Sequence, residues 1–327
     1  MLITILLFVL GFIMLIKGGD WFVDGAVGIA QRFHMPELLI GATVVSIGTT
    51  LPEVMVSCQA ALQGNAGISY GNAIGSIICN VSLIAAITIA VKPGPVDPGS
   101  LRLPAGFFTV SAAIYLLIAL TTGRFVRWQG ILFLAIFIVY MAVSTIHMKN
   151  HPEAASDSNG EEENKEAVKT GSMIKDILLL VVGAAVIAVG ANLLVNNGTL
   201  IAQWMGVPDS VIGLTMIALG TSLPELVTAI TSLMKGHGAL SLGNVIGANL
   251  FNIVLVSGAA ITLSPFRIPA EKTIAGINSS FLVDMPVMVG VMAILCLPAF
   301  LRGRLYRWQG ILLLCIYVAF TGYQFLI

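Results

Sequence analysis

The chain has 327 residues, of which 57% are apolar and 10% are charged, and its 16 basic and 16 acidic side chains give a formal net charge of +0. Soluble domains carry about 25% charged residues, so this composition predicts an integral membrane protein. The balanced charge, with no basic face, argues against a nucleic-acid partner.

Ten apolar segments of membrane-spanning length follow one another along the chain. In the first half they are predicted at residues 2–17, 38–62, 68–91, 105–121 and 127–147. In the second half they are predicted at residues 173–194, 209–234, 240–263, 281–300 and 308–326. Helices of about 20 residues suit a bilayer. The first segment lacks the basic start and cleavage site of a signal peptide, so we expect it to be retained.

The order of motifs predicts that the chain is duplicated. GATVVSIGTTLPEVMVS from Gly41 recurs 172 residues later as GLTMIALGTSLPELVTA. GNAIGSIICN from Gly71 recurs at the same offset as GNVIGANLFN, and RWQGIL at Arg127 recurs at Arg307. We therefore expect a first five-helix repeat at 1–148, a polar, acidic linker at 149–172 and a second repeat at 173–327.

Five helices is an odd number, so the two repeats must cross the membrane in opposite directions. With ten spans, one face carries only four basic residues, Arg124, Arg127, Arg267 and Lys272, and the other face carries the remaining twelve. The positive-inside rule places the second face in the cytoplasm. We therefore expect a multi-pass protein of the cell membrane, with both termini outside the cytoplasm and the linker inside. Inverted repeats of this kind are typical of secondary transporters.

Glu53 and Glu225 occupy matching positions in the middle of predicted spans. A carboxylate at bilayer depth costs at least about 2.5–3.5 kcal/mol, so its default interpretation is functional. Pro52 and Pro224 remove a helical N–H beside them, and each helix is therefore expected to be interrupted around GTT and GTS. The freed carbonyls, the Thr and Ser hydroxyls and the carboxylates form an all-oxygen set, which favours hard cations such as Na⁺ and Ca²⁺.

The segment that follows each glutamate supplies further polar side chains. Ser76 and Asn80 stand four residues apart on one helix face, and their equivalents in the second half are Ala248 and Asn252. Glycines four residues apart in the same segments allow helix backbones to approach closely. These side chains are thus predicted to lie near the interrupted helices.

GTTLPE and GTSLPE, each followed by a segment GN-x-x-G-(S/A)-x-x-x-N, resemble the two repeats of the sodium/calcium exchanger branch of the calcium/cation antiporters. The chain is most similar to the short prokaryotic members. The resemblance implies an all-α membrane fold of about ten helices in two inverted repeats, with broken helices at the ion site. It also implies alternating access, in which the first and sixth segments slide as a unit.

The resemblance further implies a role for each matching residue. Glu53 and Glu225 would hold Ca²⁺ together with backbone oxygens of Thr49 and Thr221. The residues of the flanking sodium sites and of the middle of the site would be Ser46, Thr50, Ser76, Ala218, Ser222, Asn80 and Asn252. Ca²⁺ and Na⁺ would be transported ions rather than cofactors. We expect the chain to lie in the lipid bilayer as a monomer.

Four positions depart from the family pattern. Ser46 is a mild change at a backbone-ligand position, and Thr50 keeps the hydroxyl of the usual serine. Ala248 stands where a sodium-ligating serine is common, and Asn252 stands where some members have aspartate. The last two changes leave proton-coupled exchange of Ca²⁺ or another cation open as an alternative, and a cation channel as a more distant one. No nucleophile–base pair or cofactor loop suggests an enzyme.

Overall fold

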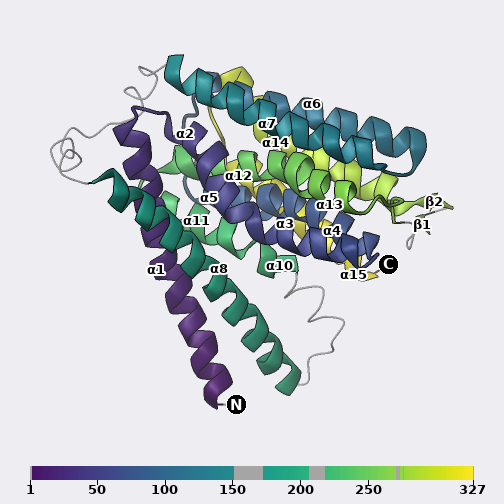
Figure 1. The fold of residues 1–327 in the computed structure, drawn as a ribbon, viewed down its shortest axis with the longest axis horizontal. Coiled ribbons are helices and arrows are strands. Elements are labelled where there is room, and N and C mark those ends of the chain that lie inside the picture. Colours follow the sequence, from purple (N-terminus) through teal and green to yellow (C-terminus); the bar gives the residue numbers. More distant parts are fainter. Residues whose placement is uncertain (1, 151–171, 206–217, 270–272, 275, 327) are drawn as a thin grey trace.

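The structure is a computed structural model that describes residues 2–150, 172–205, 218–269, 273–274 and 276–326. Helices make up most of these residues (Figure 1). The first half contains α1 (Leu2–Arg32), α2 (Glu37–Ile40), η1 (Gly41–Val45), α3 (Ser46–Leu62), α4 (Ala66–Cys79), η2 (Asn80–Ala85), α5 (Ala86–Val91), α6 (Pro98–Thr122) and α7 (Arg127–Asn150), where η marks a π-helical turn. The second half contains α8 (Met173–Trp204), α10 (Ala218–Thr221), α11 (Leu223–Met234), α12 (Gly238–Phe251), η7 (Asn252–Ser257), α13 (Gly258–Leu263), β1 (Thr273–Ile274), β2 (Ile277–Asn278), η8 (Ser280–Asp284), α14 (Met285–Arg302) and α15 (Arg307–Leu326).

These elements follow the predicted spans closely. Among the described residues, eight helical segments are long and apolar enough to cross a membrane. Nearly all of the predicted linker, at 151–171, and the start of one predicted span, at 209–217, lie outside the described residues. The first and sixth spans extend further than predicted, to Arg32 and Trp204. The sequence prediction stopped the first span at Lys17, but the polar residues beyond it stay helical because they have partners on neighbouring helices.

Backbone pairing between loops of the two halves displays the inverted repeat directly. Residues 94–96 pair with 303–305 through two hydrogen bonds of 2.9 Å each. Residues 266–268 pair with 123–125 through bonds of 2.8 and 3.1 Å. The second pair is the repeat equivalent of the first, and α6, 25 residues long, separates the two along the chain. The same contact between halves therefore occurs once at each end of the bundle.

The repeated RWQG motif joins one half to the other. Gly130 of α7 packs so tightly on α13 that an added Cβ would lie 2.6 Å from the Thr262 backbone nitrogen, and Gly310 of α15 meets Ala90 of α5 at the same distance. Arg127 donates to the Thr262 carbonyl at the end of α13, at 2.9 Å. The motif thus covers the end of a helix in the opposite repeat, which explains why it recurs.

Helices α1 and α8 form a closely packed pair that lies oblique to the other helices (Figure 1). A Cβ at Gly25 would lie 2.5 Å from the Leu180 backbone nitrogen, and one at Gly183 would lie 2.5 Å from that of Phe22. Small residues at such positions let two helices make main-chain contact. The pair shares a smaller apolar cluster with Leu39 and Ile40 of α2, Val45 of η1, Met148 of α7 and Leu240 of α12, and a larger apolar cluster fills the rest of the bundle.

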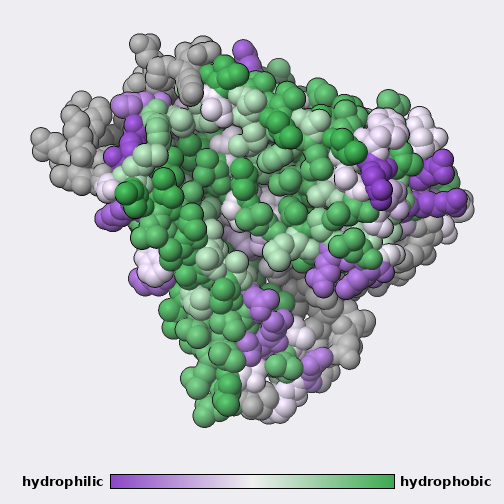
Figure 2. Space-filling model, viewed as in Figure 1, coloured by the Kyte–Doolittle hydropathy of each residue, from purple (hydrophilic) through white to green (hydrophobic). Residues whose placement is uncertain are grey.

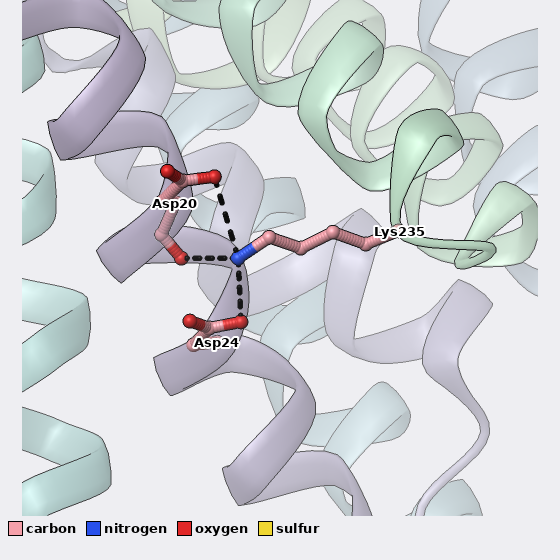
Figure 3. Close-up of polar contacts among 3 residues, drawn as sticks. All are labelled: Asp20, Asp24 and Lys235. Atoms are coloured by element: carbon pink, nitrogen blue, oxygen red, sulfur yellow. Dashed lines mark hydrogen bonds and ion pairs between the residues drawn. The ribbon is translucent and has the colours of Figure 1, made fainter.

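A charged cluster attaches this pair to the bundle at one end. The Lys235 Nζ, just beyond α11, lies 2.7 Å from Asp24 Oδ1 and 3.5 Å from Asp20 Oδ1, and it donates to the Asp20 carbonyl at 3.1 Å (Figure 3). Arg32 and Asp176 join α1 to α8 at 2.8 Å. Partly exposed ion pairs contribute up to about 1 kcal/mol each, so this cluster mainly fixes where α1 sits on α11.

The outer surface has the polarity that a bilayer demands. Large apolar side chains of α1, α8 and the other long helices are exposed, among them Leu2, Met55, Leu117 and Ile174. Figure 2 shows a largely hydrophobic face, with hydrophilic side chains gathered mainly toward the ends of the molecule. The apolar exterior is therefore the reverse of a soluble protein's surface, whereas the interior combines apolar clusters with buried polar side chains.

The main-chain contact between α1 and α8 predicts a large difference between two glycine substitutions. Gly25→Ala forces a methyl group against the Leu180 nitrogen and should lower the free energy of unfolding by about 1–3 kcal/mol. Gly106→Ala in α6 is the control, since an added Cβ there meets nothing within 4 Å, and it should be neutral or stabilising by up to about 1 kcal/mol. Unfolding of the purified protein in detergent measures both, and equal effects would contradict the packing described.

Candidate cation site

Glu53 and Glu225 lie inside the molecule, with no exposed surface. Glu53 follows Pro52 within α3, and Glu225 follows Pro224 in the first turn of α11. The two carboxylates are close enough to repel each other electrostatically. The duplication therefore brings its two matching acids to one place.

The helices around the glutamates are irregular, but differently in each half. In the second half Ser222 is a turn residue between α10 and α11, with φ −89° and ψ 4°, as the GTS motif predicted. In the first half α3 continues from Ser46 through Pro52, and the irregularity is the π-helical turn η1 at Gly41–Val45. The interruption expected at GTT itself does not occur in this half, because α3 is continuous across the motif, and the departure from α-helical geometry is a π turn shortly before it.

A pair of π turns at equivalent repeat positions carries the predicted mid-site asparagines. Asn80 is the first residue of η2 and Asn252 is the first residue of η7. Both side chains are buried, each with 1% of its surface exposed. π turns inside α-helices occur frequently at functional sites, and these two place an amide at the point where α4 and α12 pass from α-helical into π-helical geometry.

Eight side-chain oxygens of the predicted site share one property: each is buried and has no hydrogen-bond partner among the described residues. They are both oxygens of Glu53, both of Glu225, Thr50 Oγ1, Ser222 Oγ, Asn80 Oδ1 and Asn252 Oδ1. An unpaired buried polar group costs about 1–3 kcal/mol, and more if it is charged. Their concentration in six residues of the repeated motifs is the strongest structural sign of a cation site.

The hydroxyls of Ser46 and Thr49 have a different role. The single hydroxyl proton of Ser46 has two acceptors within reach, the Gly41 carbonyl at 2.7 Å and the Asn244 carbonyl at 3.0 Å. Thr49 Oγ1 donates to Asn244 Oδ1 at 3.2 Å. These side chains fix α3 against α12, so any contribution of these two positions to ion binding falls to their backbone carbonyls.

The burial and helix positions of the other predicted site residues give no further evidence for or against a ligand role. Ser76 is buried in α4, and Ala248 is fully buried in α12. Thr221 is half-buried at the end of α10. Ala218 begins α10, and its side chain lies outside the described residues.

Three further asparagines belong to this region, and the sequence analysis did not single them out. Asn72 donates to the Glu53 carbonyl at 3.1 Å and to Ser57 Oγ at 2.8 Å. Asn244 is its repeat equivalent, and the shared Gly-Asn at the start of both motifs was the available signal. Asn249 bonds to Asn80 at 3.2 Å, but its repeat equivalent is Ile77, so the duplication could not identify it.

Comparison with known proteins identifies the family. A model described as sodium/calcium exchanger protein matches residues 3–146 and 175–326. The chain belongs to the sodium/calcium exchanger family. Like the family, it is a multi-pass membrane cation antiporter and not an enzyme, and the predicted fold class of two inverted five-helix repeats is confirmed.

Individual relatives of this exchanger match along almost their whole length. It is 32% identical to the sodium/calcium exchanger MaX1 of Methanosarcina acetivorans, over 99% of each protein. It is 36% identical to an uncharacterised membrane protein of Methanocaldococcus jannaschii, over 95% of this chain and 94% of the relative. The solved sodium–calcium exchanger NCX_Mj, from crystals soaked with Na⁺ and Sr²⁺, superposes with a TM-score of 0.80 at 32% identity, with 97% of each chain covered.

Thr49 donates a hydrogen bond and Thr50 has no partner among the described residues, so replacing each of them by valine should have opposite effects on stability. Thr50→Val removes an unpartnered hydroxyl and should leave stability in cation-free buffer unchanged or raised by about 1 kcal/mol. Thr49→Val breaks the bond to Asn244 and should lower stability by about 1 kcal/mol or more. Both keep the β-branched shape, so unfolding of the two variants in chelator-treated buffer isolates the hydroxyl. If Thr50→Val destabilised as much as Thr49→Val, its hydroxyl would be structural rather than a ligand.

Proposed function

We propose that this exchanger moves Ca²⁺ in exchange for Na⁺ at a site centred on Glu53 and Glu225. The observation that carries the proposal is the group of eight unpartnered buried oxygens in a member of the sodium/calcium exchanger family. Ca²⁺ takes six to eight oxygen ligands. Both carboxylates, with the backbone carbonyls of Thr49 and Thr221, supply such a set, and the two negative charges match one divalent cation.

Sodium ions would occupy the flanks of the same site. On one side we assign Ser46, Thr50 and Ser76, and on the other Ala218 and Ser222, with both glutamates shared. Asn80 and Asn252 would line the middle. Since Ser46 uses its hydroxyl to hold α12, its ligand would be the carbonyl oxygen.

Competition for the carboxylates explains how binding becomes exchange. Two bare carboxylates in a low-dielectric interior are unfavourable. Ca²⁺ alone or several Na⁺ can neutralise them, but both together would repel each other. The protein would therefore change its access only when one ion type or the other is bound. The α1–α8 pair would move as a unit during that change, since the two helices are joined by main-chain contacts at Gly25 and Gly183.

We further propose that the acidic linker at 149–172 separates the repeats 1–148 and 173–327 on the cytoplasmic side of the cell membrane. Both termini would then face outward. The distribution of basic residues supports this orientation. The loop pairs 94–96/303–305 and 123–125/266–268, at opposite ends of the bundle, support the inversion of the two repeats. A single chain contains the whole site, so a monomer would suffice.

Proton-coupled cation exchange is the second candidate, because Ala248 and Asn252 remove oxygens from one flank. Ala248 presents only a methyl group and is fully buried. Asn252 donates to the Ala248 carbonyl at 3.0 Å and carries no charge. A buried glutamate can take up a proton without additional ligands, so a proton could replace a sodium ion on this flank.

Neutralising either glutamate should abolish transport. Glu53→Gln or Glu225→Gln leaves a single carboxylate, which cannot balance a divalent ion, so calcium uptake into proteoliposomes should fall to background. Glu37→Gln is the matched control, since Glu37 lies 2.8 Å from His237 Nδ1 outside the site and should keep near-normal uptake. Normal uptake by either site variant would rule out the assignment.

The counter-ion is identified by measuring calcium uptake under different ion gradients, in the unmodified protein and in the Ala248→Ser variant. Proteoliposomes loaded with Na⁺ should take up calcium when placed in sodium-free buffer, whereas an outward proton gradient alone should not drive uptake. Ala248→Ser restores a hydroxyl and should lower the sodium concentration needed for half-maximal exchange, by up to about tenfold if one ligand is gained. Uptake driven only by protons would establish the second candidate, and flux without any counter-ion gradient would indicate a channel.

A further inference from the structure

Asn249 occupies a position that connects the two repeats behind the cation site. It is fully buried in α12, three residues before Asn252. Its Oδ1 accepts a hydrogen bond from Asn80 Nδ2 in the first repeat at 3.2 Å. Its own Nδ2 lies 3.2 Å from Met292 Sδ on α14. Both ends of the Asn249 amide are therefore held.

Chemistry fixes the direction of this chain of bonds. The thioether sulfur of Met292 can accept a hydrogen bond but has no proton to donate. The end of Asn249 that faces Met292 must therefore be the NH₂ group, and the opposite end, which faces Asn80, must be the carbonyl oxygen. That oxygen can only accept, so Asn80 must turn its own NH₂ group toward Asn249.

The orientation of the Asn80 amide affects how this side chain interacts with a bound cation. With its NH₂ group engaged, Asn80 leaves Oδ1 on the other side, and this oxygen is buried without a partner among the described residues. A cation is attracted by an amide oxygen and repelled by the amide NH₂ group, whose hydrogens carry positive partial charge. The orientation of the Asn80 amide thus decides whether it helps or opposes ion binding.

The two mid-site asparagines are held by different means. Asn252 donates to the carbonyl of Ala248 in its own helix at 3.0 Å, so its orientation depends on local helix geometry. Asn80 depends instead on a side chain from the opposite repeat. Since the repeat equivalent of Asn249 is Ile77, only the first-repeat amide has such a support.

We propose that Asn249, backed by Met292, is a positioning residue that keeps the Asn80 carbonyl oxygen directed at the transported cation. The inference rests on the proposed function, because it takes the site of Glu53 and Glu225 to bind Ca²⁺. Asn249 itself contacts no ion in this arrangement and acts only through Asn80.

The test measures equilibrium binding of ⁴⁵Ca²⁺ to the purified full-length protein in detergent. Asn249→Leu keeps the branched shape but frees the Asn80 amide to turn, and the Kd for Ca²⁺ should rise about tenfold, as expected for loss of one oriented polar ligand. Met292→Leu conserves volume and leaves Asn249 in place. It removes only the sulfur acceptor and should raise the Kd by a smaller factor in the same direction.

The deciding variants repeat both substitutions in an Asn80→Asp background. A carboxylate has acceptor oxygens at both ends, so its orientation no longer matters, and Asn249→Leu should then raise the Kd less than about twofold. An equal loss in both backgrounds would show that Asn249 only supports the fold, and no loss in the wild-type background would also overturn the proposal.

Failure of the proposed function would look different. In that case the unmodified protein itself would bind no ⁴⁵Ca²⁺. If Asn249→Leu does not fold, the comparison of Met292→Leu with Met292→Leu/Asn80→Asp carries the same decision, because it tests the same dependence on amide orientation.

Discussion

Two carboxylates buried in the interior of a membrane protein are the constraint on which the rest of this structure depends. Removing such groups from water carries a penalty of several kcal/mol for each charge, and Glu53 and Glu225 also repel each other. A fold can tolerate this desolvation penalty and repulsion only if cations neutralise the two carboxylates and nearby oxygens coordinate those cations. Pro52 and Pro224 remove an N–H beside the glutamates, and the same repeated motifs contain buried hydroxyl and amide oxygens without hydrogen-bond partners among the described residues. Tight glycine contacts elsewhere supply the packing that this polar centre lacks.

Pseudo-symmetry in the backbone coexists with asymmetry in the chemistry. The π turns η2 and η7, the loop pairs and the RWQG contacts recur in both halves. The side chains at equivalent positions nevertheless diverge: Ala248 replaces the serine found at Ser76, and Asn249 corresponds to Ile77. The two halves of a duplicated scaffold can therefore differ in side-chain chemistry, because each position has been free to change since the duplication. The connection from Met292 through Asn249 to Asn80 is one example, since it uses the second repeat to orient a ligand of the first.

Much of this fold follows from the sequence because hydropathy and duplication are strong signals. The spans, the two halves and the central glutamates could all be predicted, and the sodium/calcium exchanger family was identified from its motifs. The extent of α1 could not, because Asp20 and Asp24 look like the end of a membrane segment until Lys235 is seen beside them. Nor could the distinction between Thr49 and Thr50, adjacent residues of one motif, since it depends on which hydroxyl meets Asn244 across the repeat boundary. The site assignments themselves remain predictions.

The loop pairs between halves also bear on how the protein is made. Among the described residues, the backbone partners of 94–96 lie at 303–305, and α5 is covered by α15 of the second repeat. During synthesis the first repeat therefore enters the bilayer with part of its surface and some of its loop amides unpaired. Its mature arrangement must wait until the ribosome has delivered the C-terminal helix. The duplicated halves are thus not two independent folding units in tandem, and biogenesis of the transporter ends with a docking step that completes both at once.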